Sequence, residues 1–346
     1  MAVSRKGGPV TLKDVAAHAR VSLSTASRAL NGSSRNVSDA LRARVERSAA
    51  DLNYSTNLLA QGIARGLSET VAVMVGSIVD PYFAGIVSGV TEVAEANGLV
   101  VTIITTGGDP SRERSALNAI RGQRPRHVVM TVSRTLDEDT EERVGRALAD
   151  YEQMGGTVAF VGGGIEGFRT LEVDNAGAAR ALGGALVAAG YQRFALLGGP
   201  SHLATPVARQ RGFVEGVTAA GGEAPLAWRI PSKINRAGGY AAAAQILATG
   251  ARPDCFFAVA DVMAIGALAA IRDAGLVPGV DVGIAGFGDV ELLEDFTPSL
   301  TTVRLPLERM GRQAVELVLD PHPGALVSSI GGEVMLRAST PPRPTS

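Results

Sequence analysis

The spacing of apolar residues divides the chain into two regions that meet near residue 70. Before this point, apolar residues recur every three or four positions in short stretches, which is typical of amphipathic helices. The pattern predicts helices over 12–19, 23–30 and 38–52, with Thr11, Ser22 and Ser38 as N-caps. Because only three residues separate the first two helices, we expect a helix-turn-helix unit over residues 10–54.

From Val71 onward, short apolar runs alternate with longer Ala-rich amphipathic stretches. The runs predict strands over 71–75, 99–104, 127–132, 158–161, 194–197, 255–260 and 282–285. The stretches between them predict helices over 83–96, 111–121, 138–154, 176–189, 207–220, 239–248 and 262–274. Such alternation is typical of parallel sheets with helices on both faces, and 280 residues suit two such layers. The predicted fold class is an all-α helix-turn-helix head followed by an α/β body of two doubly wound parallel-sheet subdomains.

The charge distribution changes the picture of what the chain binds. The net charge of -1 would by itself argue against a nucleic-acid partner. Of 33 basic and 34 acidic residues, however, the first 66 residues hold ten and four, a charge of +6, and the remaining 280 hold 23 and 30, a charge of -7. This asymmetry indicates a basic module that faces DNA or a membrane, joined to an acidic body.

Composition excludes several other settings for the chain. A single Cys cannot form an intramolecular disulfide, and residues 1–10 lack the apolar stretch of a secretory signal, so we expect a reducing, cytoplasmic location. The longest apolar run, 256–271, is shorter than the roughly 20 residues that span a bilayer. We therefore expect no membrane partner.

The sequence offers little support for catalysis or for a cofactor. Its Gly-rich pieces, 162–164 and 198–199, form neither a dinucleotide fingerprint nor a P-loop. His202 follows Ser201 without a GxSxG elbow around it. The spacing of His, Cys and carboxylate residues matches no metal site. We expect a protein that is not an enzyme and that carries no cofactor and no metal.

The segment VTLKDVAAHARVSLSTASRALN, residues 10–31, resembles the DNA-binding head of the LacI family of bacterial transcription regulators. The resemblance continues through residues 36–66 and into the body, with DPYFAGI (80–86), VDNAGAA (173–179), RQRGF (209–213), IAGFGD (284–289) and PSLTTVRLPLERMG (298–311) in the family order. It implies a head that binds double-stranded DNA and a periplasmic-binding-protein-like body that binds a small-molecule effector. It also implies a homodimer on an inverted-repeat operator and association with the nucleoid.

The second predicted helix is the candidate reader of the major groove. We expect Ala26 and Ala29 to face inward and the polar side to face DNA. Arg28 alone can make a bidentate contact to guanine, and Leu23 can contact a thymine methyl. Arg20 stands in the turn where many such motifs place Gly. The predicted major-groove residues are Ser22, Leu23, Ser24, Thr25, Ser27, Arg28 and Asn31.

Residues 55–66, STNLLAQGIARG, resemble the family hinge, which becomes helical when two copies meet in the minor groove. The sequence is a poor isolated helix, so its ordering must come from partner and DNA contacts. Ile63 stands where family members usually have a Leu wedge between base steps. The predicted minor-groove residues are Tyr54, Asn57, Ala60, Ile63 and Ala64.

The resemblance also implies an effector site, and the sequence departs from the family there. Arg209 matches an effector-clamping arginine, but Gly288 stands where many members have Asp, Ala260 where Asn or Ser is usual, and Ile234 near a common aromatic position. Retention of Arg with loss of Asp favours an anionic ligand. The block 286–289 also resembles the corresponding block of family regulators that respond to gluconate-like sugar acids. The predicted effector residues are Asp80, Tyr82, Phe83, Arg209, Ile234, Ala260, Asp261, Phe287, Gly288 and Asp289.

These inferences give a domain plan and a function. We expect a disordered basic tail over 1–9, the head over 10–54, the hinge over 55–68 and a disordered tail over 341–346. The first effector subdomain comprises 69–172 and 303–334, and the second comprises 173–302 and 335–340, with crossings around Val173, residues 301–306 and Met335. The predicted function is a DNA-binding transcriptional regulator, a repressor, that answers a sugar or sugar acid. The alternative is a stand-alone sugar-binding protein with the same body.

Overall fold

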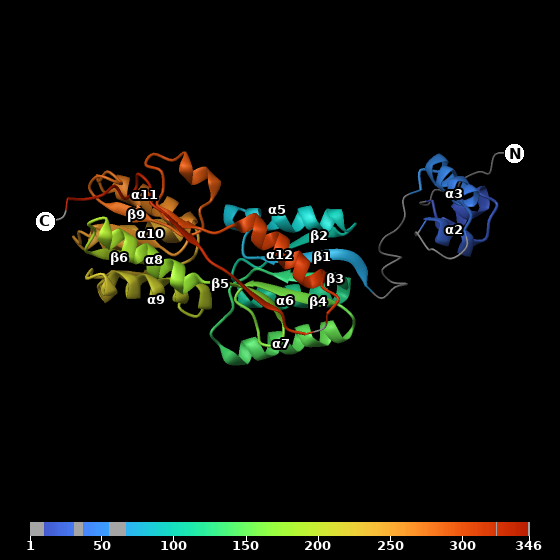
Figure 1. Ribbon diagram of the computed structural model, residues 1–346, viewed down its shortest axis with the longest axis horizontal. Coiled ribbons are helices and arrows are strands. Elements are labelled where there is room, and N and C mark those ends of the chain that lie inside the picture. The colour runs from blue at the N-terminus through green and yellow to red at the C-terminus, as the bar shows by residue number, and fades with distance from the viewer. Residues whose placement is uncertain (1–9, 31–36, 55–66, 323, 345–346) are drawn as a thin grey trace. The chain divides into compact units, whose positions relative to one another are not determined.

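A computed structural model describes residues 10–30, 37–54, 67–322 and 324–344 of the 346-residue chain (Figure 1). Internal contacts divide it into two compact units, Met1–Ser68 and Glu69–Ser346. We call the first unit the head and the second the body, and we describe each by itself.

The head contains α1 (Leu12–His18), α2 (Leu23–Leu30) and α3 (Asp39–Asp51), which confirms the predicted helices to within a residue. At the start of α1, the backbone N–H and the hydroxyl of Thr11 both donate to the Asp14 carboxylate, at 2.8 and 2.7 Å. At the start of α2, the Ser22 hydroxyl accepts the Thr25 N–H at 3.1 Å. These caps satisfy donors that the first turns would otherwise leave without partners.

Small and β-branched side chains form the core of the head. The buried members, drawn from all three helices and the turn after α1, are Val15, Ala16, Ala19, Ala26, Ala29, Val45 and Ala49. Arg20 begins the turn between α1 and α2 with a φ of 54°, the left-handed region that Gly adopts at little cost. The turn predicted at this position is therefore present, with Arg20 adopting the strained conformation itself.

The body consists of two lobes, each built on a parallel sheet (Figure 1). The first lobe has a six-stranded sheet in the order β11-β5-β4-β3-β1-β2. Its strands are β1 (Ser68–Val75), β2 (Val100–Thr105), β3 (Pro125–Met130), β4 (Thr157–Gly162), β5 (Arg169–Val173) and β11 (Val327–Ile330). Helices α5 (Pro81–Ala96) and α12 (Leu307–Leu319) cover one face, and α6 (Pro110–Gln123) and α7 (Glu138–Gln153) cover the other.

Successive side chains along the strands of the first lobe point to opposite faces of the sheet and contribute to the core on both. Val71, Val73 and Val75 of β1 pack in the cluster that holds α5 and α12, whereas Ala72 and Met74 pack in the cluster under α6 and α7. A central strand of a doubly covered sheet must bury both sides, and this requirement explains its continuous apolar sequence.

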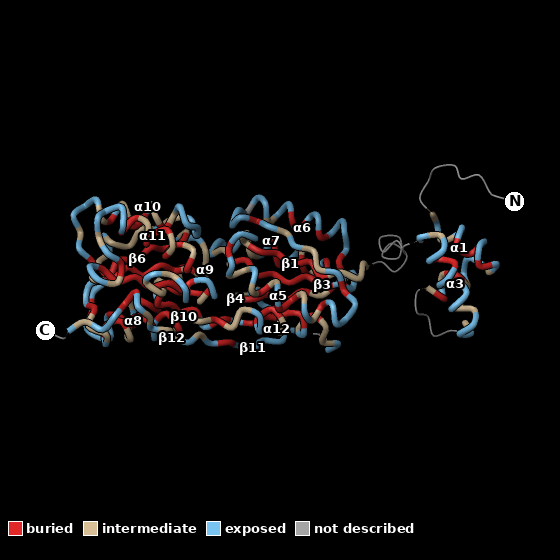
Figure 2. Tube along the Cα trace, turned by 90° about the horizontal axis from the view of Figure 1, so that it is seen from above, coloured by how far each residue is buried: buried red, intermediate tan, exposed pale blue. Residues whose placement is uncertain are grey.

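The second lobe has a four-stranded parallel sheet in the order β7-β6-β8-β9. Its strands are β7 (Arg229–Pro231), β6 (Phe194–Gly198), β8 (Cys255–Ala258) and β9 (Gly283–Ala285). Helices α8 (Asn175–Ala188) and α9 (Ala204–Ala219) lie on one face, and α10 (Arg236–Ala248) and α11 (Asp261–Asp273) lie on the other. Two short 3-10 helices, η1 (Leu226–Trp228) and η2 (Glu291–Glu294), complete this lobe. In Figure 2 the central strands of the lobes, β1, β3 and β4 in the first and β6 in the second, run through the buried interior.

The chain passes between the lobes after β5, at β10 (Thr302–Arg304) and at β12 (Glu333–Met335). Strands β10 and β12 pair with each other in an antiparallel ladder, Thr302 opposite Met335. The crossings predicted from the sequence lie around Val173, residues 301–306 and Met335. Two of the three connections are therefore hydrogen-bonded together rather than being independent linkers.

Some elements were not predicted, and one prediction differs from the structure. Helix α12 and strands β5, β7, β10, β11 and β12 were missed. Residues 341–344 were predicted to be disordered, but the Pro341 carbonyl accepts the Tyr191 hydroxyl at 3.0 Å and Arg343 lies over the Tyr191 ring at 4.5 Å. The Arg343 N–H also donates to the Ala189 carbonyl at 2.8 Å. Ring stacking and backbone pairing thus hold a segment whose Pro-rich composition suggested none.

Candidate DNA-binding face and ligand cavity

The outer face of α2 is the candidate nucleic-acid interface in the head. Ser22, Leu23, Ser24 and Arg28 are exposed, and Thr25 and Ser27 are half-buried. Ala26 and Ala29 face the core, as predicted. The helix therefore presents hydroxyls and one guanidinium to solvent, with its small side chains allowing close packing on the other helices.

Short polar contacts order this face. The Ser22 hydroxyl lies 2.9 Å from the Ser24 hydroxyl and 2.8 Å from that of Thr25. Arg28 Nε donates to the Ser24 carbonyl at 3.2 Å. One guanidinium nitrogen is thus used within the helix, while the side chain as a whole remains exposed.

Several predicted DNA contacts lie outside the described residues: Asn31, Asn57, Ala60, Ile63 and Ala64. Tyr54 is described and half-buried. Its side chain packs against the core of the head, and its N–H donates to the Ala49 carbonyl at 2.8 Å. Tyr54 therefore has a packing role in the head, which the sequence did not indicate.

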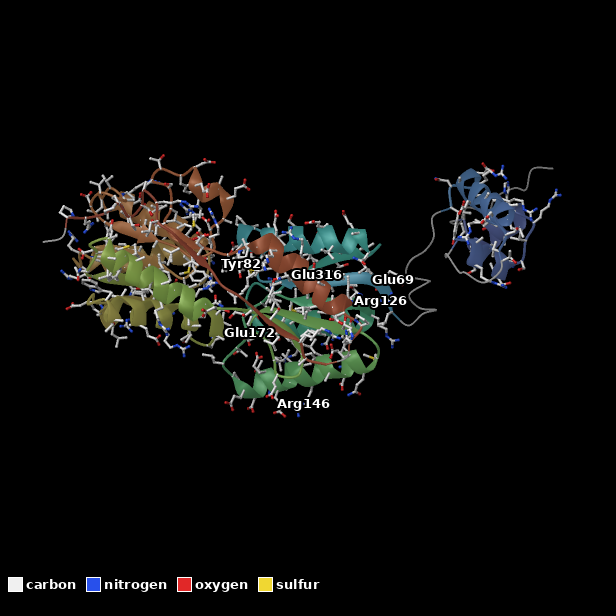
Figure 3. The ribbon with its side chains drawn as sticks, viewed as in Figure 1. Glu69, Tyr82, Arg126, Arg146, Glu172 and Glu316 are labelled. Atoms are coloured by element: carbon white, nitrogen blue, oxygen red, sulfur yellow. The ribbon has the colours of Figure 1, made fainter. Side chains whose placement is uncertain are left out.

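In the body, a cavity lies between the two lobes, and residues of both lobes form its wall. Figure 3 labels Tyr82 at this junction. The cavity is bounded by segments that follow β3, β4, β8 and β9 and by the first turns of α5, α9 and α11. Ligands in open α/β folds bind at this position, outside the carboxyl ends of the strands.

Arg209, on the first half of α9, is a buried cation in the cavity wall. Its Nε donates to the Asn175 side-chain oxygen and its Nη1 to the Val259 carbonyl, both at 2.8 Å. The guanidinium lies 3.9 Å from the centre of the Phe287 ring and 5.9 Å from that of Tyr82. Burial lowers the pKa of Arg209, and Tyr82, Asp261 and Asp80 oppose that shift.

Two carboxylates, Asp80 and Asp261, share the cavity with Arg209. Asp80 caps α5 by accepting the Tyr82 N–H at 3.1 Å, and burial raises its pKa. Asp261 begins α11 and accepts the Thr302 hydroxyl at 2.7 Å and the Val290 N–H at 3.2 Å. Burial raises the pKa of Asp261 to about 6, against the lowering effect of those two hydrogen bonds. The cavity therefore combines one fixed cation with two acids.

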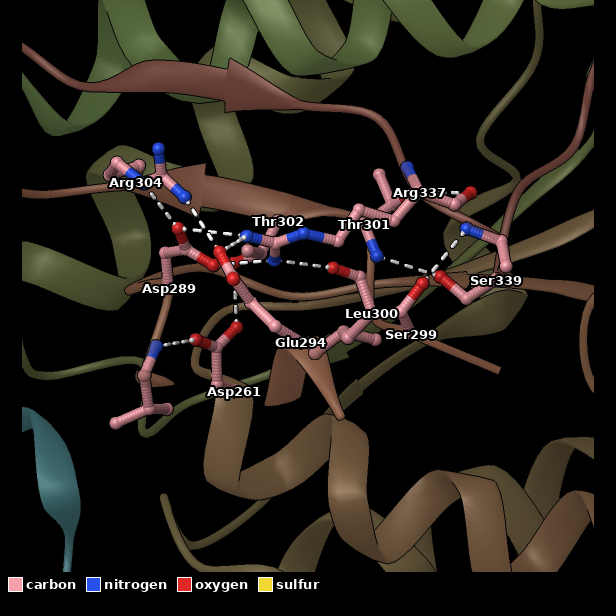
Figure 4. A network of polar contacts seen from close by, with 12 residues as sticks. Asp261, Asp289, Glu294, Ser299, Leu300, Thr301, Thr302, Arg304, Arg337 and Ser339 are labelled. Carbon is pink, nitrogen blue, oxygen red and sulfur yellow. Dashed lines mark hydrogen bonds and ion pairs between the residues drawn. The ribbon is translucent and has the colours of Figure 1, made fainter. Parts of the chain in front are cut away.

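Two predicted effector residues, Gly288 and Asp289, are not in the cavity wall. Asp289 is turned to Arg304 and Arg337, which donate to its carboxylate at 2.5 Å each (Figure 4). Gly288 has a φ of 140°, and a Cβ there would lie 3.1 Å from an oxygen of Asp261. The missing side chain at 288 thus leaves room for the Asp261 carboxylate and permits a backbone conformation that L-residues rarely adopt.

The other eight predicted effector residues all line the cavity: Asp80, Tyr82, Phe83, Arg209, Ile234, Ala260, Asp261 and Phe287. Sequence reasoning missed further wall residues: Thr131, Ser133, Val161, Gly162, Asn175, Thr205, Pro206, Val259 and Val290. Most of these lie at the carboxyl ends of predicted strands or just before predicted helices. The rule that places ligands at strand ends could therefore have found them.

Comparison with known proteins finds a matching family for the head and another for the body. Residues 11–57 match the family described as bacterial regulatory proteins, lacI family, and residues 184–340 match the periplasmic binding protein-like domain. The ribose operon repressor of Haemophilus influenzae is 31% identical over 319 residues, covering 89% of this chain and 91% of that protein. The chain belongs to the LacI family.

Other members of the LacI family extend the likeness over nearly the whole chain. The HTH-type transcriptional regulator GalS of Salmonella typhimurium is 30% identical, covering 92% of this chain and 91% of that protein. A crystal structure of the lac repressor bound to ONPG in the repressed state has a TM-score of 0.79 and 26% identity, covering 96% of this chain and 100% of that one. The protein is thus a DNA-binding transcriptional regulator and not an enzyme. No helix in the described part of the chain is long and apolar enough to cross a membrane.

Proposed function

We propose that this LacI-family protein is a repressor that binds an inverted-repeat operator as a homodimer and is controlled by a small carbohydrate in the cavity between its lobes. The observation that carries the DNA-binding part is the exposed polar face of α2, backed by buried Ala26 and Ala29. A free sugar-binding protein would have no use for such a face or for a segment with a charge of +6.

Arg28 is the specificity residue of this proposal. A guanidinium can donate two hydrogen bonds to the O6 and N7 atoms of guanine, which discriminates against another base by about 1 to 3 kcal/mol. The neighbouring hydroxyls of Ser22, Ser24 and Thr25 suit phosphate oxygens, which fix the register but carry no sequence information. Half-site specificity therefore depends mainly on Arg28.

Arg47 provides a matched control for Arg28. It is exposed on α3, and its Nε donates to the Ala43 carbonyl at 3.2 Å, the same distance and spacing as in Arg28. With DNA selected from a random pool, Arg28→Ala should relax the preference at one base pair in each half-site, and Arg47→Ala should leave it unchanged. Equal weakening on all operator variants would instead make Arg28 a phosphate contact, and selection of no sequence by the unmodified protein would overturn DNA reading altogether.

The charges in the cavity favour a neutral ligand over the sugar acid predicted from the sequence. Asp80 and Asp261 in their ionised forms outweigh the single positive charge of Arg209, so a carboxylate on the ligand would meet net repulsion. Sugar hydroxyls can donate to these carboxylates and accept from Arg209. Phe83, Phe287 and Ile234 provide apolar surface for the faces of a sugar ring.

Titration calorimetry at pH 7.5 separates the two ligand classes. We expect a neutral pentose or hexose, with ribose and galactose as the first probes, to bind with an affinity that Arg209→Gln reduces at least tenfold. Gluconate is titrated under the same conditions as the acidic probe. Tighter binding of gluconate than of the neutral sugars would return the assignment to a sugar acid.

The dimer part of the proposal rests on an apolar surface of the first lobe, which we call the α5–β2 face. Strand β2 is an edge of the six-stranded sheet, and Ile103 on it is exposed, as are Ile78 and Val79 before α5. Ile78 and Ile103 border a groove that also includes Val87 and Thr91 of α5. Contiguous exposed apolar residues beside an open edge strand are typical of a surface that a partner covers, and a second copy gives the symmetry that an inverted repeat requires.

A further inference from the structure

Two loops from opposite lobes form a short antiparallel bridge beside the cavity. The Leu136 N–H donates to the His202 carbonyl at 2.7 Å, and the Ala204 N–H donates to the Arg134 carbonyl at 2.9 Å, which pairs Thr135 with Leu203. Residues 133–136 follow β3 in the first lobe, and residues 202–205 span the start of α9 in the second lobe. The bridge therefore joins the lobes directly, apart from the three chain crossings.

Side chains reinforce the bridge on both sides. The Thr135 hydroxyl donates to the His202 carbonyl at 3.3 Å, and the Thr205 N–H donates to the Ser133 hydroxyl at 3.1 Å. Ser133 and Thr205 also line the cavity. A molecule in the cavity would thus touch one residue from each half of the bridge.

Arg134 fixes the position of the first-lobe half of the bridge through ion pairs with two helices of that lobe. This buried side chain makes a bidentate pair with Glu141 of α7, at 3.0 and 2.9 Å, and a bond of 2.6 Å to Glu113 of α6. Glu141 also accepts the Thr135 N–H at 3.0 Å. A bidentate, buried pair has a fixed geometry, so the carbonyl of Arg134 is already oriented toward Ala204.

We propose that residues 133–136 and 202–205 form a latch that keeps the lobes closed over the cavity, with the Arg134–Glu113–Glu141 cluster setting its strength. The chain crossings permit rotation of one lobe on the other, whereas the latch fixes the angle and must break before the cavity opens. The inference rests on the proposed function in one respect, because it makes cavity occupancy the event that the latch responds to. Through Ser133 and Thr205, a ligand would favour one lobe angle over the other, as control by population shift requires.

An engineered disulfide reports directly on latch closure. Thr135 and Leu203 occupy a non-hydrogen-bonded position of an antiparallel pair, where Cα atoms lie about 4.5 Å apart, within the range that a disulfide spans. In the full-length Thr135→Cys/Leu203→Cys variant, oxidised glutathione would take two electrons and two protons from the thiols. The native Cys255 is buried and does not compete. We expect the pair to oxidise nearly completely, as measured by mass spectrometry and thiol counting.

Two further substitutions in the double-cysteine variant test the Arg134 cluster. One is at Glu141 in the cluster, and the other is at the neighbouring residue Glu142. Glu141→Gln removes the bidentate partner and should slow disulfide formation at least tenfold. Glu142→Gln is the matched control, because Glu142 is an exposed residue on the same helix paired only with Arg146 among the described residues, and it should change the rate less than twofold. Thermal unfolding of each variant verifies that it is folded.

Ala204→Pro tests the latch without touching the ion cluster. Position 204 is the first residue of α9, where Pro is well tolerated, but the substitution removes the N–H that donates to Arg134. Amide exchange of the peptide containing Leu136 should accelerate at least tenfold, while exchange within the remainder of α9 should stay as in the parent protein. Unchanged exchange at Leu136, or equal oxidation rates in the Glu141→Gln and Glu142→Gln backgrounds, would overturn the latch.

Operator binding distinguishes failure of the latch from failure of the proposed function. A double-cysteine protein that oxidises as expected but selects no DNA would retain the latch and refute the repressor. A protein that binds operator DNA but does not form the disulfide while folded would refute the latch alone. If both hold, the oxidised protein should bind operator with an affinity that the sugar no longer changes, and reduction should restore the response.

Discussion

His127, the third residue of β3, is buried, with 6% exposure. Its Nδ1 lies 2.6 Å from the Thr157 hydroxyl, which donates onward to the Val318 carbonyl at 3.0 Å. The hydroxyl must then accept from the imidazole, which assigns the proton to Nδ1. Burial, with a smaller effect from the charges of Arg126 and Arg169, lowers the pKa of His127 to about 4.

This pKa predicts a loss of stability on mild acidification. The unfolded chain takes up a proton at His127 near pH 6.5 and the folded chain only near pH 4, so the contribution of His127 is complete above pH 6.5 and lost between pH 6.5 and 4. The loss is at most about 3 kcal/mol. Urea unfolding at a series of pH values should show a shallower decline for His127→Gln than for the parent protein.

The pH dependence of the parent protein's stability does not by itself report the contribution of His127. The raised pKa of Asp261 acts in the opposite direction, because a folded-state pKa of about 6 lets the folded protein take up a proton before the unfolded chain does. The difference between parent and His127→Gln cancels that common effect. His18→Gln, at an exposed histidine of the head, is the control and should follow the parent profile. A His127→Gln profile parallel to that of the parent would contradict the assignment.

Helix pairs in the body approach one another through glycines. A Cβ at Gly89 of α5 would overlap the Glu308 carbonyl of α12, and one at Gly311 of α12 would overlap the Ile86 carbonyl of α5. The same reciprocal arrangement recurs between α10 and α11, at Gly239 and Gly266. These contacts allow helix backbones to touch, so that the sheet below each pair is covered without a gap.

Gly89→Ala should therefore destabilise the body. The added methyl must separate α5 from α12, and overpacking of this kind costs about 1 to 3 kcal/mol. Gly184→Ala is the matched control, because Gly184 lies inside α8 with open space around its Cα, and Ala is the better helix former there by about 1 kcal/mol. The urea midpoint should fall for the first variant and stay level or rise for the second; equal midpoints would contradict the close-approach account.

The elements that sequence reasoning found and missed differ in how local their signals are. Strands such as β1 and β6 are continuous apolar runs, and their sequences alone indicate them. Strand β5 contains Arg169 and Glu172, while β10 and β12 have three residues each and pair across a separation of about thirty residues. No window of the sequence shows such pairing. Asp289 was assigned to the ligand for the same reason, because its partner Arg337 lies 48 residues away.

At the scale of the whole molecule, the charge of -1 is the sum of a basic N-terminal segment and an acidic body. The segment of +6 supplies attraction to phosphates, which weakens steeply with salt. The body contributes repulsion and a site for the controlling ligand. Specificity for a long operator then depends on joining two heads, because one α2 face can read only a few base pairs. The α5–β2 face is the proposed means of joining them.

A charged substitution in the α5–β2 face should prevent dimer formation and leave each copy folded. In a two-fold interface each residue occurs twice, so Ile103→Glu places two carboxylates in one apolar contact. We expect this variant to sediment as a monomer and to bind an inverted-repeat operator at least a hundredfold more weakly, with unchanged affinity for a half-site. Val277→Glu, at an exposed apolar residue of the second lobe, should remain dimeric. If both variants remain dimeric, the copies meet through another surface; if both become monomeric, the interface extends over the second lobe, and the α5–β2 face is only part of it.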